Sequence, residues 1–197
     1  MKPVLLLAVA LLCAYTSAST FPDKVVPPSS SKEQNFPRTE EIQLVVSQSE
    51  RAFESYKQSI SFEEALDSSK QNSFGVEQDK ELLKAGQKLT SALTKNPDGF
   101  HGVGGLLLLS TLDDASRNAA LCTASAFSEM AKVKDVSQGY QLLAVIQSCT
   151  DVSQQLYIVS QNVHALLVRE MESQALLNEQ AVEALHTCSA AIQNQKK

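Results

Sequence analysis

The sequence predicts an all-α protein, a bundle of four or five helices preceded by a signal peptide and a disordered Pro/Ser-rich leader. Three observations support this fold class. From residue 38 to residue 197 the chain contains one proline, Pro97. Helix-forming Ala, Leu, Gln, Glu and Lys dominate the same region. It also lacks the sustained two-residue alternation that is typical of strands. We therefore expect a signal peptide at 1–18, a leader at 19–37 and a helical domain at 38–197.

The N-terminus has the three parts of a secretory signal peptide. Lys2 gives a basic start, residues 4–13 are an unbroken apolar run, and small residues at 16–18 supply the cleavage site after Ala18. The run is too short to span a membrane. The leader that follows contains four prolines and a run of three serines, a composition typical of extended, disordered chain. We expect a secreted, extracellular protein.

The first predicted helix begins at Thr39, whose hydroxyl suits the capping position, and the acidic pair 40–41 favours the positive end of the helix dipole. The segment 61–64, Ser-Phe-Glu-Glu, has the pattern of a capping box. It predicts that this helix breaks near Ser59 and restarts. Residues 68–75 are expected to form a turn.

The next predicted helix covers about 76–95. Four leucines share one side of it and charged residues share the other; the charged set is Glu77, Lys80, Lys84 and Lys88. The sequence Asn-Pro-Asp-Gly at 96–99 ends this helix.

The segment 99–112 is rich in glycine and leucine, with four of the seven glycines of the chain between 99 and 105. Two interpretations stay open. In the first, a flexible loop leads into a buried helix that runs to about residue 133. In the second, the segment contacts lipid or a membrane, although it is too short to span one. The side chains expected to make that contact are Phe100, Val103, Leu106, Leu107, Leu108 and Leu109.

The sequence Asp-Val-Ser-Gln occurs at 135–138 and again at 151–154. Each copy can cap a helix, so we expect one helix at about 136–148 and another from 152, with one continuous helix as the alternative. Apolar residues recur every three or four positions from Leu142 to Leu166, which predicts a packed seam. The seam lapses near Glu170, and a kink or a separate last helix is expected at about 171–178.

Three cysteines remain after the signal peptide: Cys122, Cys149 and Cys188. If the helices on either side of Lys134 form an antiparallel hairpin, Cys122 and Cys149 lie at similar heights, within reach of a disulfide. We favour this bridge over Cys149–Cys188, which requires the chain to fold back near Met171. Cys188 is then free or forms a covalent dimer.

No catalytic, metal or cofactor pattern is present. Glu183 and His186 form a single Glu-x-x-His motif, whereas di-iron bundles need two. His101, His164 and His186 are not spaced as a zinc site. The net charge is −5 with no basic run, which argues against nucleic acid as a partner.

These features predict a secreted, non-enzymatic helical binding or effector protein of a glandular fluid such as saliva, venom or seminal fluid. It would present a helical surface to a protein partner or carry a small apolar ligand. The alternative is a membrane-active protein that uses residues 99–112 and has no stable membrane span.

Overall fold

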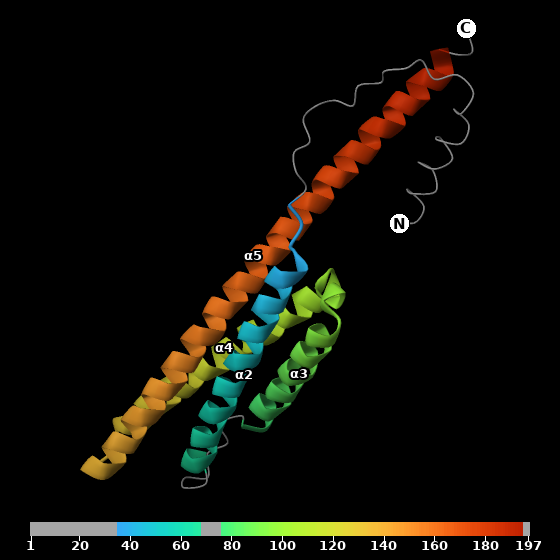
Figure 1. Cartoon of the computed structure of the whole chain (residues 1–197). Coiled ribbons are helices and arrows are strands. Elements are labelled where there is room, and N and C mark those ends of the chain that lie inside the picture. Colours follow the sequence, from blue (N-terminus) through green and yellow to red (C-terminus); the bar gives the residue numbers. More distant parts are fainter. Residues whose placement is uncertain (1–34, 68–75, 195–197) are drawn as a thin grey trace. The chain divides into compact units, whose positions relative to one another are not determined.

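The computed structural model describes residues 35–67 and 76–194, and these residues contain helices and no strand. The elements are α2 (Thr39–Asp67), α3 (Val76–Lys95), the 3-10 helix η1 (Pro97–Phe100), α4 (Val103–Met130) and α5 (Val136–Asn194) (Figure 1). The all-α prediction is confirmed for this part of the chain, which has four α-helices. The signal peptide, most of the leader and the turn expected at 68–75 lie outside the described residues.

The chain divides into two units, of which Pro37–Val168 is the larger. This unit is a helical bundle made of α2, α3, η1, α4 and the first part of α5. The second unit contains the end of α5, from residue 169.

Two apolar clusters fill the bundle. The larger joins residues of all four helices and of η1, and its most buried large side chains include Phe53, Phe100, Leu112 and Leu156. The smaller lies between α4 and α5 around Cys122 and Cys149. The predicted seam on α5 is confirmed, because each of its members is buried: Leu142, Val145, Cys149, Val152, Leu156, Val159, Val163 and Leu166.

Helix α2 continues through the break expected near Ser59, so that prediction is wrong. The Ser61 hydroxyl donates to the Lys57 carbonyl of the preceding turn at 3.1 Å, and the Ser59 hydroxyl donates to the Tyr56 carbonyl at 2.9 Å. Both serines therefore bond back into the helix and do not cap a new one. At the start of α2, the Glu41 carboxylate accepts from the Arg38 backbone N–H at 2.8 Å.

Helix α5 is also continuous, so its expected division at 148–152 is wrong and the single-helix alternative is right. Asp135 does cap α5, since its carboxylate accepts from the Ser137 N–H at 3.1 Å. The second copy of the motif lies inside the helix, where the Ser153 hydroxyl donates to the Ser116 carbonyl of α4 at 2.9 Å. No separate helix begins at 171–178, because α5 runs without interruption to Asn194.

Helices α2 and α3 approach closely at Gly86. A Cβ atom at this position would overlap the ring of Phe53, with Cε2 at 2.8 Å, and Phe53 is fully buried. Glycine is thus required here by the packing of the two helices. The four predicted inner leucines of α3 all face the core: Leu83 and Leu93 are buried, and Leu82 and Leu89 are partly buried against them.

Candidate functional site

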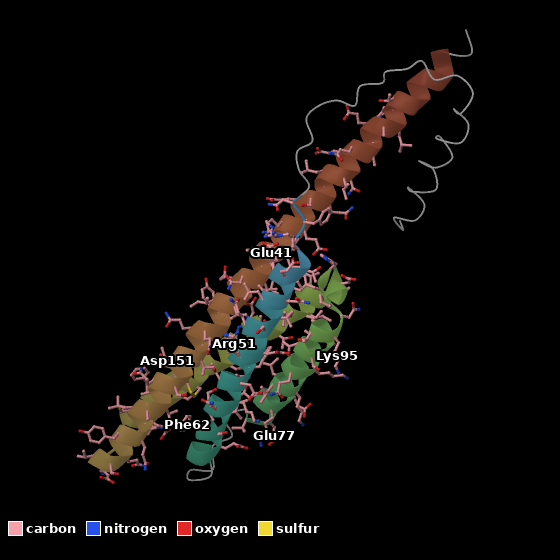
Figure 2. All side chains as sticks on the ribbon, in the orientation of Figure 1. Glu41, Arg51, Phe62, Glu77, Lys95 and Asp151 are labelled. Carbon is pink, nitrogen blue, oxygen red and sulfur yellow. A yellow bond between two sulfur atoms is a disulfide. The ribbon has the colours of Figure 1, made fainter. Side chains whose placement is uncertain are left out.

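The outer face of α5 in the larger unit is apolar and almost free of charge. Asp151 is the only Asp, Glu, Lys or Arg between residues 136 and 168; Figure 2 labels it on the helix. At about 100° per residue, six exposed apolar side chains fall within about 100° of arc on this helix. They define what we call the α5 face: Val136, Tyr140, Leu143, Tyr157, Ile158 and Val168.

Exposure on the α5 face is high. Tyr140 is 70% exposed, Tyr157 56% and Ile158 55%. Residues 136–168 also contain six glutamines, and all of them are exposed: Gln138, Gln141, Gln147, Gln154, Gln155 and Gln161. The face therefore combines aromatic and aliphatic surface with uncharged hydrogen-bonding groups.

An open cleft of about 420 Å³ lies where α4 turns into α5. Met130 and Val133 line it from the α4 side, and Tyr140 and Leu143 line it from α5. Because Tyr140 and Leu143 also belong to the α5 face, the cleft extends that face to the end of the helical hairpin.

The inner side of α5 is fastened to α4 by a disulfide between Cys122 and Cys149, whose Cα atoms lie 6.1 Å apart (Figure 2). The predicted bridge between these two cysteines is confirmed. Ser116 and Ser153 add two reciprocal bonds, each hydroxyl donating to the other residue's carbonyl, at 3.0 and 2.9 Å. Cys188 lies within α5, but its side chain is outside the description, so a free or dimer-forming Cys188 stays a prediction.

The glycine- and leucine-rich segment enters α4 through a tight turn at Gly102, whose φ is 77°. Phe100 and Leu108 are fully buried and Leu109 is partly buried against the core. Val103, Leu106 and Leu107 are 69%, 56% and 52% exposed. Of the six side chains expected to contact lipid, three therefore lie on the surface of the bundle, and the lipid-contact hypothesis itself stays a prediction.

The three histidines lie apart, one each on the η1–α4 connection, the middle of α5 and its end, and all are exposed. His164 follows the buried seam residue Val163, as expected of a residue at the edge of a packed face. Glu183 is exposed as well.

A buried polar cluster joins α2, α3 and α4. Tyr56 and Glu63 come from α2, Asp79 from α3 and Asn118 from α4. The Tyr56 hydroxyl donates to Asp79 Oδ1 at 2.7 Å, and Asn118 Nδ2 donates to the same oxygen. Glu63 is only 3% exposed and Asp79 only 4%, so two carboxyl groups are buried side by side.

The two carboxyls depend on each other electrostatically. Burial raises the pKa of Glu63 to about 8, and the charge of Asp79 and a hydrogen bond to it act in the same direction. Burial also raises the pKa of Tyr56, with the bond to Asp79 adding to the effect. At neutral pH Glu63 therefore stays protonated and donates a hydrogen bond to the Asp79 carboxylate.

A small cleft of about 100 Å³ opens beside this cluster. Its lining combines the two carboxyls with other polar groups and one side of the bridged cysteine pair: Glu63, Gln78, Asp79, Asn118, Leu121, Cys122 and Ser125. A Glu63 carboxylate oxygen and the two bridged sulfurs lie within 4.8 Å of one another. Because these sulfurs are bonded to each other, they do not act as thiolate ligands.

Sequence reasoning missed this cluster. Glu63 was assigned to a capping box, and Asp79 was one acidic residue among several near the start of α3. The available signal was positional: Asp79 lies one turn before Leu83 and Tyr56 one turn after Ala52, on the sides of their helices that face the core.

Comparisons with known proteins give no relative: no family model, no curated protein and no solved structure matches this chain. Within the described ranges, none of the helices combines the length and the apolar character that crossing a membrane requires.

Proposed function

We propose that this chain is a secreted, non-enzymatic helical binding protein that engages a protein partner through the α5 face. One observation carries the proposal: residues 136–168 expose two tyrosines and several aliphatic side chains while containing one charged residue, Asp151. The cores of protein–protein interfaces have this composition, with charged residues depleted and tyrosine enriched.

The composition of the face also defines the partner. Charged side chains lose their hydration in a buried contact unless they are paired, and the α5 face offers only Asp151 for pairing. The partner surface is therefore apolar and uncharged at its centre, with hydrogen-bonding groups that match the exposed glutamines. Tyr140 and Tyr157, which combine large apolar area with a hydroxyl, are the expected anchors.

Secretion is part of the proposal and is supported by two features. The first eighteen residues have the pattern of a signal peptide, and the Cys122–Cys149 disulfide suits an oxidising compartment. The choice of a glandular fluid is an extension of the same proposal.

Carriage of a small apolar ligand has weaker support than protein binding. A carrier needs a cavity lined by the leucines of α3, α4 and α5. Leu83, Leu108, Leu112 and Leu156 instead pack into the common core. The cleft at the end of the hairpin is open, which suits a partner's side chain better than an enclosed ligand.

Membrane activity is a second candidate, because Val103, Leu106 and Leu107 are exposed together on the first two turns of α4. Leakage of dye from anionic or neutral liposomes tests it, with Leu106→Gln combined with Leu107→Gln as the variant. Leakage that the variant abolishes would favour this function over protein binding.

The principal experiment combines cross-linking and affinity measurement. The mature chain is cross-linked in the fluid into which it is secreted, the linked protein is purified, and its dissociation constant is measured by calorimetry. We expect Tyr157→Ala or Ile158→Ala to weaken binding at least about tenfold, as for interface anchors. Glu81→Ala on the outer face of α3 is the matched control and leaves affinity unchanged.

Two outcomes overturn the proposal. One is equal affinity of the α5 and α3 variants for the purified partner. The other is a stable homodimer, seen by sedimentation equilibrium, that Ile158→Glu dissociates; the face would then be covered by a second copy of the chain.

A further inference from the structure

The cleft beside the buried carboxyl cluster has an oxygen-rich lining. Glu63 and Asp79 contribute carboxylates, Gln78 and Asn118 contribute amides, and Ser125 contributes a hydroxyl. Hard divalent cations prefer this donor set. The nearby sulfurs form a disulfide, so a thiolate site for zinc or copper is not available in the oxidised protein.

One acceptor in the cluster has no partner. Glu63 Oε1 is buried and receives no hydrogen bond from any described residue, although its side chain is only 3% exposed and lines the cleft. A buried carboxyl oxygen without a hydrogen-bond partner is costly. A ligand that supplies positive charge at this point would satisfy it.

We propose that Glu63 and Asp79 bind one calcium ion in the cleft between α2, α3 and α4. Calcium displaces the proton that Glu63 holds at neutral pH, and the two carboxylates then supply the charge. The amide oxygens of Gln78 and Asn118 and the Ser125 hydroxyl are the neutral ligand groups within the same cleft. Tyr56 and Asn118 orient the Asp79 carboxylate by donating to its Oδ1. Hydrogen bonds to a ligating carboxylate hold it in the orientation that a metal site needs.

The size of the cleft fits this assignment. Its volume of about 100 Å³ accommodates a cation together with two or three waters, at about 30 Å³ for each water. Calcium tolerates an irregular set of carboxylate, amide and water oxygens, whereas magnesium demands a near-octahedral arrangement. With two carboxylates, we expect a dissociation constant of about 10⁻⁴–10⁻³ M, the range of extracellular calcium modules.

Thermal unfolding of the disulfide-intact mature chain tests the site. The protein is stripped with a chelator and then titrated with calcium chloride at constant ionic strength. At ten times the dissociation constant we expect Tm to rise by about 3–6 °C, with a smaller rise in magnesium. Glu63→Gln should abolish the rise, and Glu81→Gln, an exposed acid on α3, should retain it.

The Glu63→Gln variant is expected to fold, because the glutamine amide can donate to Asp79 as the protonated acid does; its circular dichroism checks this. A second readout uses terbium, which shares the oxygen preference of calcium and emits when a nearby tyrosine is excited. The chain has no tryptophan, so Tyr56, bonded to Asp79 at 2.7 Å, is the expected donor. Tyr56→Phe should remove the emission and Tyr140→Phe should leave it.

The proposal is overturned if calcium leaves the Tm of the wild-type chain unchanged at 10 mM. It is equally overturned if calcium raises the Tm of wild type and Glu63→Gln alike, since the ion would then bind elsewhere. Neither result bears on the α5 face, because no residue of that face lines the cleft.

Discussion

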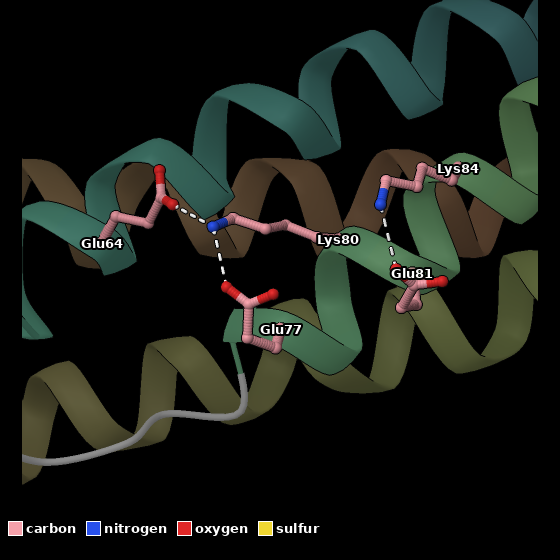
Figure 3. A network of polar contacts seen from close by, with 5 residues as sticks. All are labelled: Glu64, Glu77, Lys80, Glu81 and Lys84. Atoms are coloured by element: carbon pink, nitrogen blue, oxygen red, sulfur yellow. Dashed lines mark hydrogen bonds and ion pairs between the residues drawn. The ribbon is translucent and has the colours of Figure 1, made fainter.

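Helix α3 and the first part of α5 belong to the same bundle, yet their outer faces differ completely. On α3, Lys80 bonds to Glu77 and Lys84 to Glu81, each at 3.0 Å, and Lys80 also pairs with Glu64 of α2 (Figure 3). The hydrogen bonds to Glu64 and, next, to Glu77 raise the pKa of Lys80. On α5, Asp151 is the only charged residue between 136 and 168, and tyrosine, leucine, isoleucine and glutamine cover the face.

The fold does not require this difference. Both helices bury apolar inner faces in the same core, and the outer positions of each are exposed. Surface ion pairs such as those of α3 contribute little to stability. Their charged side chains mainly keep the exposed face of the helix hydrated. The near absence of such charges from residues 136–168 needs another explanation, and an interface provides one.

The two helices are also held to the bundle in different ways, because a disulfide joins α5 to α4. Loss of this disulfide is the change from which we expect the largest effect on stability. Replacing Cys122 and Cys149 together by alanine removes a link between positions 27 apart in sequence. We expect the free energy of unfolding to fall by about 3–4 kcal/mol, measured by urea unfolding. Cys188→Ser is the control and leaves the bridge in place. A loss below about 1 kcal/mol would show that packing alone holds α5 to α4.

Helix α3 has no covalent link in the described structure and depends on close approach to α2. Gly86→Ala places a methyl group against the buried Phe53 ring, and we expect it to destabilise the protein by about 2 kcal/mol. Gly139→Ala on α5 is the matched control. Its nearest neighbour would be Val133 Cγ1 at 4.0 Å, so it should be neutral or stabilise by up to about 1 kcal/mol. Equal effects of the two variants would contradict the close packing at Gly86.

The contact between α2 and α3 at the buried carboxyls stabilises the protein to an extent that depends on pH. The folded-state pKa of Glu63 is raised from 4.5 to about 8, so the folded protein binds a proton more tightly than the unfolded chain. Its stabilising contribution is complete below about pH 4.5 and is lost as pH rises towards 8. The groups that face Glu63 are Asp79 and Tyr56.

In chelator, the free energy of unfolding of wild type should therefore fall between pH 5 and pH 8 relative to Glu63→Gln, by about 2 kcal/mol in total. The measurement is chemical unfolding at four pH values. Glu81→Gln should retain the wild-type slope. Parallel curves for wild type and Glu63→Gln would show that Glu63 is not titrating in this range.

The smallest effects are expected on the two outer faces. Ile158→Gln on α5 and Lys84→Gln on α3 should each change the free energy of unfolding by less than about 0.5 kcal/mol. Thermal unfolding provides the measurement. A loss above 1 kcal/mol for Ile158→Gln would mean that the α5 face contributes to the fold, and the argument for an interface would weaken.

Much of the fold follows from periodicity. The helix at 76–95, the α5 seam and the Cys122–Cys149 bridge could be predicted because spacing along a helix determines which side chains share a face. The errors occurred where a local capping pattern competed with packing. Ser61 and Ser153 both belong to plausible capping boxes, yet Ser61 bonds within α2 and Ser153 bonds to α4.

The candidate sites were harder to predict. Pairing of Glu63 with Asp79 requires α2 and α3 to meet, and apart from its position along the helix neither residue's local sequence indicates burial. The α5 face was visible in principle as a stretch with one charged residue, Asp151, but the seam on the opposite side of the same helix has the same apolar character. Periodicity places Leu156 in the seam and Tyr157 outside it, but only the packing of the bundle shows that Tyr157 is exposed.

The uneven distribution of charge over the surface affects how copies of the chain repel one another in solution. The net charge of −5 makes copies of the chain repel one another, but almost none of that charge lies on residues 136–168. Two molecules that approach through residues 136–168 meet weaker repulsion, and salt at physiological strength screens the remainder beyond about 8 Å. At high protein concentration, crowding would therefore bring molecules together preferentially along this stretch, and dilution would separate them.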